Sequence, residues 1–192
     1  MGIEFELKFS ASAARQAAIR EKYPHLAPIS METTYYDTPD RVLSLRHWTL
    51  RRRLENGRSV CTLKIPAPGG ARGEWETECG GILEAVPQLC ALGAPGELAA
   101  LTQGGVTEVC GARFTRLAGM IRLEDCAVEL ALDAGVLTGG GREVPLREVE
   151  VELKSGAREG AVAFAKALAE EFCLVPQPKS KYRRALDLAE GR

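Results

Sequence analysis

The sequence predicts a mainly β protein of the α+β class, in which one antiparallel sheet curls or closes and helices pack outside it. Eight or so segments alternate in hydrophobicity with the period of two typical of strands, and short turns join most of them. The chain has 192 residues, 45% of them hydrophobic, and contains no repeat, low-complexity tract or long linker. We therefore expect a single domain over residues 1–192 with a sizeable core.

The N-terminal part of the chain predicts a strand, a helix and a second strand. Residues 3–9 alternate strictly between apolar side chains at odd positions and charged side chains at even positions, which indicates a strand. A helix is predicted over about 13–22, because Ser12 can cap its N-terminus and Pro24 would end it. Residues 31–38 are rich in Thr and Tyr and run into a Pro-Asp turn, which favours a strand.

A β-hairpin and another strand follow. The dipeptide Asn56-Gly57 separates strands predicted at 48–55 and 58–65, and it suits a two-residue hairpin turn. A Pro- and Gly-rich loop then leads to a strand at 72–79.

In the second half of the sequence, the spacing of hydrophobic residues changes twice between a helical and a strand-like period. Residues 82–102 carry Leu and Ala at helical spacing and predict two short helices, broken by Pro87 and Pro95. A further helix is expected over roughly 158–173, and a tail at 176–184 leads into a short end segment. Between these helical regions the alternation predicts strands at 108–118, 120–125, 127–137 and 142–155.

Composition narrows the class of protein. The 25 Lys and Arg nearly balance 26 Asp and Glu, which argues against a coat for nucleic acid or an anionic membrane but not against a small polyanion. The six Cys form no CxxC pair and the two His lie far apart, so neither zinc nor haem is indicated. We see no signal peptide or apolar membrane span, and expect a cytoplasmic monomer or homodimer.

The polar faces of the predicted strands carry unusual charge. Glu148, Glu150 and Glu152 share one face, with neighbours about 7 Å apart. Two carboxylates at that distance repel by about 2.4 kcal/mol at an effective dielectric near 20. A solvated outer face would relieve this repulsion, and for one strand alone that interpretation is favoured. The interior of a barrel would instead require bound cations.

Other strands repeat the pattern, with acidic residues gathered on some strands and basic residues on others. This segregation favours a polar lumen that holds a divalent cation on its acidic side and a polyphosphate on its basic side. Carboxylate donors without His or Cys select Mg²⁺, Mn²⁺ or Ca²⁺. Arg and Lys from several strands would neutralise the phosphoryl oxygens. The charged faces are Glu4, Glu6 and Lys8; Arg51 and Arg53; Thr62 and Lys64; Arg72, Glu74, Glu76 and Glu78; and Glu129 and Asp133.

Short motifs occur in a fixed order along almost the whole chain. They are EFELK at 4–8, YYDTP at 35–39, LRRR at 50–53, TLK at 62–64, VELALDAG at 128–135, EVEVEL at 148–153 and SK at 180–181. Together they resemble the motifs of the CYTH superfamily, the triphosphate tunnel metalloenzymes. The resemblance is closest to the stand-alone CYTH module of bacterial inorganic triphosphatases.

This resemblance implies a closed eight-stranded antiparallel β-barrel, or tunnel, that binds a triphosphate with Mg²⁺ or Mn²⁺ and hydrolyses its terminal phosphate. The metal ligands it implies are Glu4, Glu6, Glu150 and Glu152. The phosphate-binding residues it implies are Lys8, Arg51, Arg53, Lys64, Arg72, Arg116, Lys181 and Arg184. Besides Glu4, Glu6 and Lys8, the catalytic candidates are three possible general bases on inward faces, namely Glu74, Glu129 and Glu148.

The sequence departs from the family at one point. Family members often carry two basic residues at i and i+2 on the sixth strand, whereas here Arg116 is followed by Ala118. The second basic group is therefore either absent or supplied by Arg113 or Arg122.

The leading functional hypothesis is hydrolysis of inorganic tripolyphosphate to diphosphate and phosphate. The alternatives are a class IV type adenylate cyclase, a thiamine triphosphatase, and a non-catalytic module that binds polyphosphate or a nucleotide. We expect no nucleic-acid partner and no membrane association.

Overall fold

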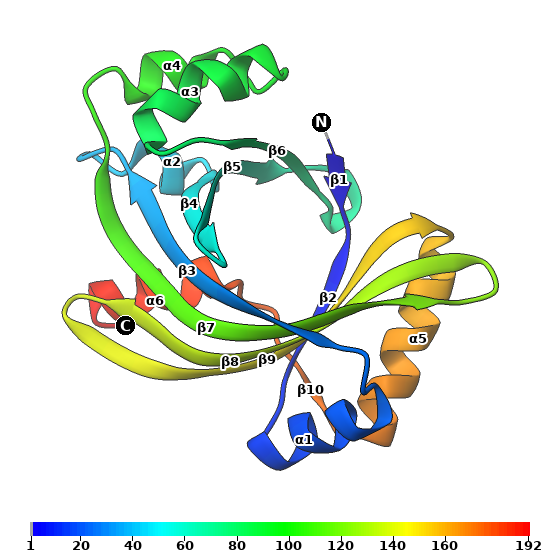
Figure 1. Cartoon of the computed structure of the whole chain (residues 1–192). Coiled ribbons are helices and arrows are strands. Elements are labelled where there is room, and N and C mark those ends of the chain that lie inside the picture. The colour runs from blue at the N-terminus through cyan, green and yellow to red at the C-terminus, as the bar shows by residue number, and fades with distance from the viewer. Residues whose placement is uncertain (1) are drawn as a thin grey trace.

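The computed structural model describes residues 2–192, with only the backbone described for residues 2, 3 and 70. Ten strands form one antiparallel sheet in the order β1-β6-β5-β4-β3-β7-β8-β9-β2-β10. The sheet curves strongly around a central region (Figure 1). A mainly β antiparallel protein with helices, as predicted, is thereby confirmed.

The strands are β1 (Gly2–Glu4), β2 (Glu6–Ser10), β3 (Ala27–Asp37), β4 (Thr49–Glu55), β5 (Arg58–Pro66), β6 (Arg72–Glu78), β7 (Thr107–Arg122), β8 (Cys126–Gly139), β9 (Arg142–Gly156) and β10 (Val175–Pro176). The helices are α1 (Ala13–Lys22), α2 (Val42–Leu45), α3 (Ile82–Ala91), α4 (Glu97–Thr102), α5 (Arg158–Glu171) and α6 (Lys181–Glu190), with one 3₁₀ turn at Pro68–Gly70. Among the described residues, no helix combines the length and the apolar character needed to cross a membrane.

The N-terminal segment pairs with two different parts of the sheet. The single strand predicted at 3–9 is interrupted at Phe5, because β1 pairs with β6 and β2 pairs with β9. The Arg158 guanidinium stacks on the Phe5 ring, 4.0 Å from its centroid, and also donates to the Gly69 carbonyl at 3.1 Å. Arg158 therefore connects the start of α5 to both the bend in the N-terminal segment and the β5–β6 loop.

The closed eight-stranded barrel predicted from the sequence is not confirmed. The described sheet has ten strands, and β1 and β10 lie at its two edges. Val175 of β10 pairs with Ser10, so the second side of β2 is covered by the C-terminal tail and not by β6. The N-terminal segment nevertheless contacts both sides of the curved sheet, one through each half.

The apolar residues of the alternating strands face outward under helices, as expected for a polar interior. On one side, the odd-numbered face of β9 packs with α1 and α5, through residues such as Val151, Ile19 and Leu168. On the other side, β4, β5 and β6 pack against α2, α3 and α4, with Leu63 and Trp75 at the centre. These two cores place the even-numbered charged residues of β9 on the inner face.

Helix α6 departs from the expectation that every helix packs outside. Tyr182, Ala185 and Leu186 of α6 pack against Phe114 and Leu146, which lie on the inner face of the sheet. Along β7 and β9 this face changes from charged to apolar. The inward position next to Arg116 is Phe114, and the inward position next to Glu148 is Leu146. The apolar end of the inner face therefore buries the apolar side of α6.

Other boundaries also differ from those expected. The predicted strands 108–118 and 120–125 form one strand, β7, because Gly119 stays in the ladder opposite Leu130. Pro87 lies inside α3 and does not break it, since the buried residues of this helix hold it against the sheet. The hairpin turn is as predicted, with positive φ at Asn56 and Gly57.

Candidate functional site

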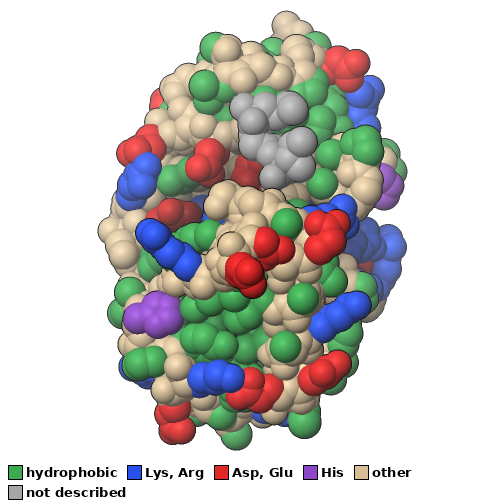
Figure 2. All heavy atoms as spheres, turned by 90° about the vertical axis from the view of Figure 1, so that its right-hand side faces the viewer, with side chains coloured by type: hydrophobic (Ala, Val, Ile, Leu, Met, Phe, Trp, Pro, Cys, Tyr) green, Lys and Arg blue, Asp and Glu red, His purple; other side chains and the backbone are tan. Residues whose placement is uncertain are grey.

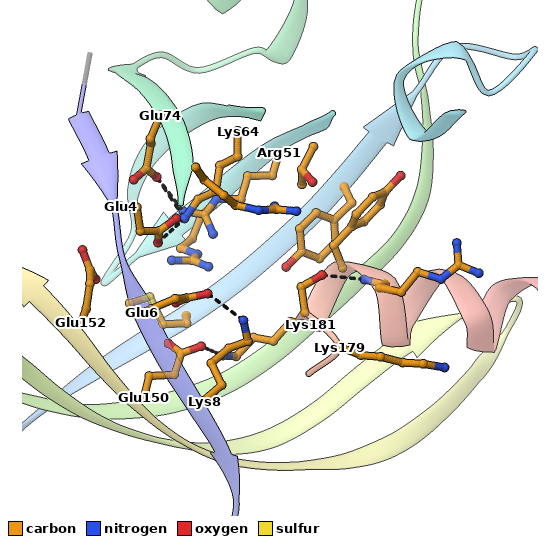
Figure 3. A pocket seen from close by; sticks show the side chains of 18 of the residues that line it. Glu4, Glu6, Lys8, Arg51, Lys64, Glu74, Glu150, Glu152, Lys179 and Lys181 are labelled. Carbon is orange, nitrogen blue, oxygen red and sulfur yellow. Dashed lines mark hydrogen bonds and ion pairs between the residues drawn. The ribbon is translucent and has the colours of Figure 1, made fainter. Parts of the chain in front are cut away.

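A cavity of about 680 Å³ lies within the curve of the sheet. Its charged lining includes ten Lys and Arg and eight Glu, so the site carries a small excess of positive charge. Figure 3 shows Glu4, Glu6, Glu74, Glu150 and Glu152 around the N-terminal strands, with Lys181 and Lys179 on the side of α6. On the outer surface seen in Figure 2, basic and acidic side chains are scattered among hydrophobic and other side chains.

Most of the site residues predicted from the sequence line this one cavity. Alternation along the strands places all of them there except Lys181, because each strand residue occupies the inner position of its strand, whereas Lys181 begins α6. The lining residues among those predicted are Glu4, Glu6, Lys8, Arg51, Arg53, Lys64, Arg72, Glu74, Arg116, Glu129, Glu150, Glu152 and Lys181.

Glu148 and Arg184 lie outside the lining. The Glu148 side chain is fully buried, and its Oε2 accepts from Arg184 Nη1 at 2.5 Å. Neither is therefore placed to touch a ligand in the cavity, and Arg184 reaches the site only through Glu148.

Each carboxylate near the N-terminal strands already has an internal cation. Lys64 Nζ donates to Glu4 Oε1 at 2.5 Å and lies 3.2 Å from Glu74 Oε1. Lys8 Nζ donates to Glu6 Oε1 at 3.0 Å (Figure 3). Burial opposes ionisation of Glu74, but Lys64 and Arg51 outweigh it and lower the pKa of that carboxyl.

A second, deeper network joins β7, β8 and β9 to α6. Arg116 donates to both carboxylate oxygens of Asp133 at 2.8 Å and also to Glu150. Lys181 Nζ lies 2.6 Å from Glu150 Oε1 and 2.8 Å from Asp133 Oδ2, and it also donates to Glu148. Three carboxyl groups thus face three basic side chains, counting Arg184.

Burial and neighbouring charges together set the pKa values of this network and of nearby Arg53. Burial opposes ionisation of Glu150, but Lys181 and Arg116 outweigh it and hold its pKa well below the usual range. Burial, together with the neighbouring Glu150, raises the pKa of Glu148 to about 7 even though Lys181 opposes the change. Burial, Arg51 and Arg116 lower the pKa of Arg53 to about 10. These groups are held in a crowded, poorly solvated space.

The four predicted metal ligands do not form one compact group. Among the described residues, the acidic cluster whose oxygens lie within 4.8 Å of one another is Asp133, Glu148 and Glu150, and basic side chains contact all three. Glu4 has a different environment, because its Oε2 is buried without a hydrogen-bond partner. A buried carboxylate oxygen with no donor is an available ligand for a hard cation, so the donors on this side of the cavity fit a divalent cation.

Sequence reasoning missed several basic residues of the cavity. Lys154 follows Glu152 at the next inward position of β9, so the same alternation could have identified it. Lys179 and Arg183 also line the cavity, and the irregular tail before α6 gave no such pattern. Arg113 and Arg122, the two suggested replacements for a second basic group on β7, do not line it. Arg113 instead pairs with Glu143 on the exposed surface.

The fold and the cavity define a class of protein, an antiparallel β-sheet curved around a densely charged interior. The sequence matches the CYTH domain family over residues 2–186, and the chain belongs to this family. It is 28% identical over 153 residues to an inorganic triphosphatase from Haemophilus influenzae, covering 79% of this chain and 44% of that protein. The chain therefore spans less than half the length of this relative.

Solved structures share the fold. HpAC1 from Hippeastrum, described as having a dominant triphosphatase activity, superposes with a TM-score of 0.65 at 18% identity, covering 100% of this chain and 97% of that one. The PH1819 protein from Pyrococcus horikoshii OT3 has a TM-score of 0.62 at 23% identity, covering 98% and 99%. At these identities the likeness concerns the fold alone.

Proposed function

We propose that this protein hydrolyses a triphosphate with the help of a divalent cation, and that inorganic tripolyphosphate is the substrate. The observation that carries the proposal is the single cavity in which ten basic side chains face eight carboxylates. A metal–triphosphate complex supplies both the anion that the basic groups need and the cation that the carboxylates need. The membership of the CYTH family and the inorganic triphosphatase relative support the same activity.

The phosphate groups would be bound by basic side chains from several strands. Lys8, Lys64 and Lys181 line the cavity, and each is held by a carboxylate in the free protein. On binding, phosphoryl oxygens would take over the contacts now made by these carboxylates. Arg51, Arg53, Arg72 and Arg116 complete the proposed phosphate-binding set. Arg184 would act by supporting Glu148, because it lies outside the cavity lining.

The cation would be held on the carboxylate side of the cavity. Glu4, Glu6, Glu150 and Glu152 remain the proposed ligands, and the unpartnered oxygen of Glu4 is the feature that best fits this role. A bound Mg²⁺ or Mn²⁺ withdraws charge from phosphoryl oxygens and positions water. Glu150 contacts Arg116 and Lys181 in the free protein, so its contribution requires those cations to turn toward the phosphates.

The proposed reaction needs no protein nucleophile. Water attacks the terminal phosphorus in line with the bridging oxygen, the bond to that oxygen breaks, and diphosphate leaves with its charge stabilised by Lys and Arg. Of the three suggested bases, Glu129 is best placed to accept the proton from water, since it faces the cavity. Glu148 is enclosed by protein, and the lowered pKa makes Glu74 a weaker base.

The experiment is to measure phosphate release from tripolyphosphate, ATP and thiamine triphosphate, each with Mg²⁺ and with Mn²⁺. We expect metal-dependent release, fastest from tripolyphosphate. Lys8→Ala should mainly raise KM, and Glu152→Gln should mainly raise the metal concentration needed for half-maximal rate. Formation of cyclic AMP would indicate a cyclase instead. Tight binding without turnover would indicate a binding module, and unchanged kinetics in both variants would refute this site.

A further inference from the structure

Three carboxylates form a row across adjacent strands of the cavity. Glu152 of β9 is directly opposite Glu6 of β2 on one side and Glu129 of β8 on the other. All three side chains line the cavity. Directly opposed residues have Cβ atoms about 5 Å apart, and like charges at such positions destabilise a sheet. The row therefore requires cations close by.

The row has two ammonium groups, one toward each end. Lys8 contacts Glu6 at 3.0 Å. Lys154 Nζ lies 2.8 Å from Glu152 Oε1 and 3.9 Å from Glu129 Oε1, so it bridges the other two carboxylates. Arg116 also approaches Glu129, at 4.0 Å.

The pair Glu129–Glu152 would otherwise suit a divalent cation. Mg²⁺ is usually held by one or two carboxylates together with water and substrate phosphates. The ammonium group of Lys154 lies between these two carboxylates and contributes one positive charge there. A second dication at the same place would have to displace the ammonium and would be repelled by it.

We propose that the ammonium group of Lys154 is a permanent counter-ion of Glu129 and Glu152. It thereby prevents a divalent cation from binding between these two carboxylates. Lys154 therefore leaves one cation site on the carboxylate side of the cavity, the proposed site of Glu4, Glu6, Glu150 and Glu152, with no second ion between Glu129 and Glu152. This inference rests on the proposed use of a metal in the cavity. It assigns a specificity role to a lysine that would otherwise be taken as one more phosphate-binding group.

The test is a titration of the protein with Mn²⁺ alone, in which electron paramagnetic resonance counts bound and free ions. Lys154→Met removes the charge while keeping an unbranched chain. We expect this variant to bind one more Mn²⁺ per chain than the wild type. Lys154→Arg, which keeps the charge, should have the wild-type stoichiometry. Lys166→Met is the matched control, since Lys166 is an exposed residue of α5 away from the cavity.

Equal Mn²⁺ stoichiometry in Lys154→Met and Lys166→Met would overturn the proposal, as would an additional ion in Lys154→Arg. Lys154→Gln gives a second neutral variant if Lys154→Met unfolds at a lower temperature. Because this titration contains no triphosphate, its outcome does not depend on hydrolysis. Absence of phosphate release with the expected Mn²⁺ counts would contradict the proposed function and leave the role of Lys154 supported.

Discussion

At the scale of single residues, the buried ion pairs around Lys181 explain how the basic side chains of the cavity are held in position. Asp133 and Glu148 are fully buried, and their contacts with Arg116, Lys181 and Arg184 hold the two cavity-facing cations in place. Removing one partner of such a network leaves an uncompensated buried charge, which is costly. We therefore interpret Asp133 and Glu148 as positioning residues and not as ligands of the substrate.

The titration of Glu148 gives a pH prediction for the metal-free protein. Its pKa is about 7 in the folded protein and has an ordinary value of 4.5, so the folded state holds the proton more tightly. The stabilisation is present below pH 4.5 and is lost as the pH rises through 7. Glu148→Gln lacks this loss. Between pH 5 and 8 the wild type should lose roughly 1–3 kcal/mol of unfolding free energy relative to the variant.

Urea denaturation with EDTA at both pH values measures this difference. An identical difference between wild type and Glu148→Gln at pH 5 and pH 8 would show that Glu148 does not titrate in this range.

Residue-level prediction from sequence succeeded where strand alternation decides the outcome. The inward positions of Glu4, Lys64, Arg116 and Glu152 follow from the period of two along their strands. The partners of these residues could not be predicted, because register between strands far apart in sequence sets them. Glu148 illustrates this limit, since it shares a face with Glu150 but lies behind the cavity lining.

At the scale of elements, α6 is a helix where the sequence pattern predicted only a tail and a short end segment. Ser180 caps it by accepting from the Arg183 backbone N–H at 3.1 Å, and this start places Lys181 in the cavity. The preceding prolines suggested an irregular tail, and the helix is rich in charge. The apolar side of α6 is short, and its packing role can be recognised only once the apolar end of the inner face is seen beneath it.

A close approach between β8 and α6 tests this placement of the helix. A Cβ added to Gly139 would lie 2.5 Å from the Ala185 carbonyl oxygen and 2.8 Å from the Ala189 backbone nitrogen. Gly139→Ala should therefore displace α6, lower the unfolding free energy by roughly 1–3 kcal/mol and weaken triphosphate binding through Lys181. Gly104→Ala is the matched control, because a Cβ there meets nothing within 4 Å.

Denaturation and calorimetric titration with tripolyphosphate measure both effects. If Gly139→Ala and Gly104→Ala behave alike in both measurements, α6 does not pack closely on β8 at Gly139.

At the scale of the whole molecule, the net charge of −1 results from two opposed groups and not from a lack of charge. The curvature of the sheet brings these groups into one cavity, while the interrupted N-terminal segment contributes to both sides of it. The sequence predicted the antiparallel sheet and its polar interior. It could not predict the ten-stranded arrangement, because that depends on where the N-terminal segment leaves β6 after β1, so that β2 pairs with β9 and with the distant tail.

The proposed function requires that this cavity bind a triphosphate together with a divalent cation. The most direct measurement is a crystal structure of the protein soaked with tripolyphosphate and Mn²⁺, with anomalous scattering used to locate the metal. We predict triphosphate density in contact with Lys8, Lys64 and Lys181, and an anomalous peak beside Glu4. Triphosphate and metal bound elsewhere on the molecule, with the cavity retaining its internal ion pairs, would contradict the account.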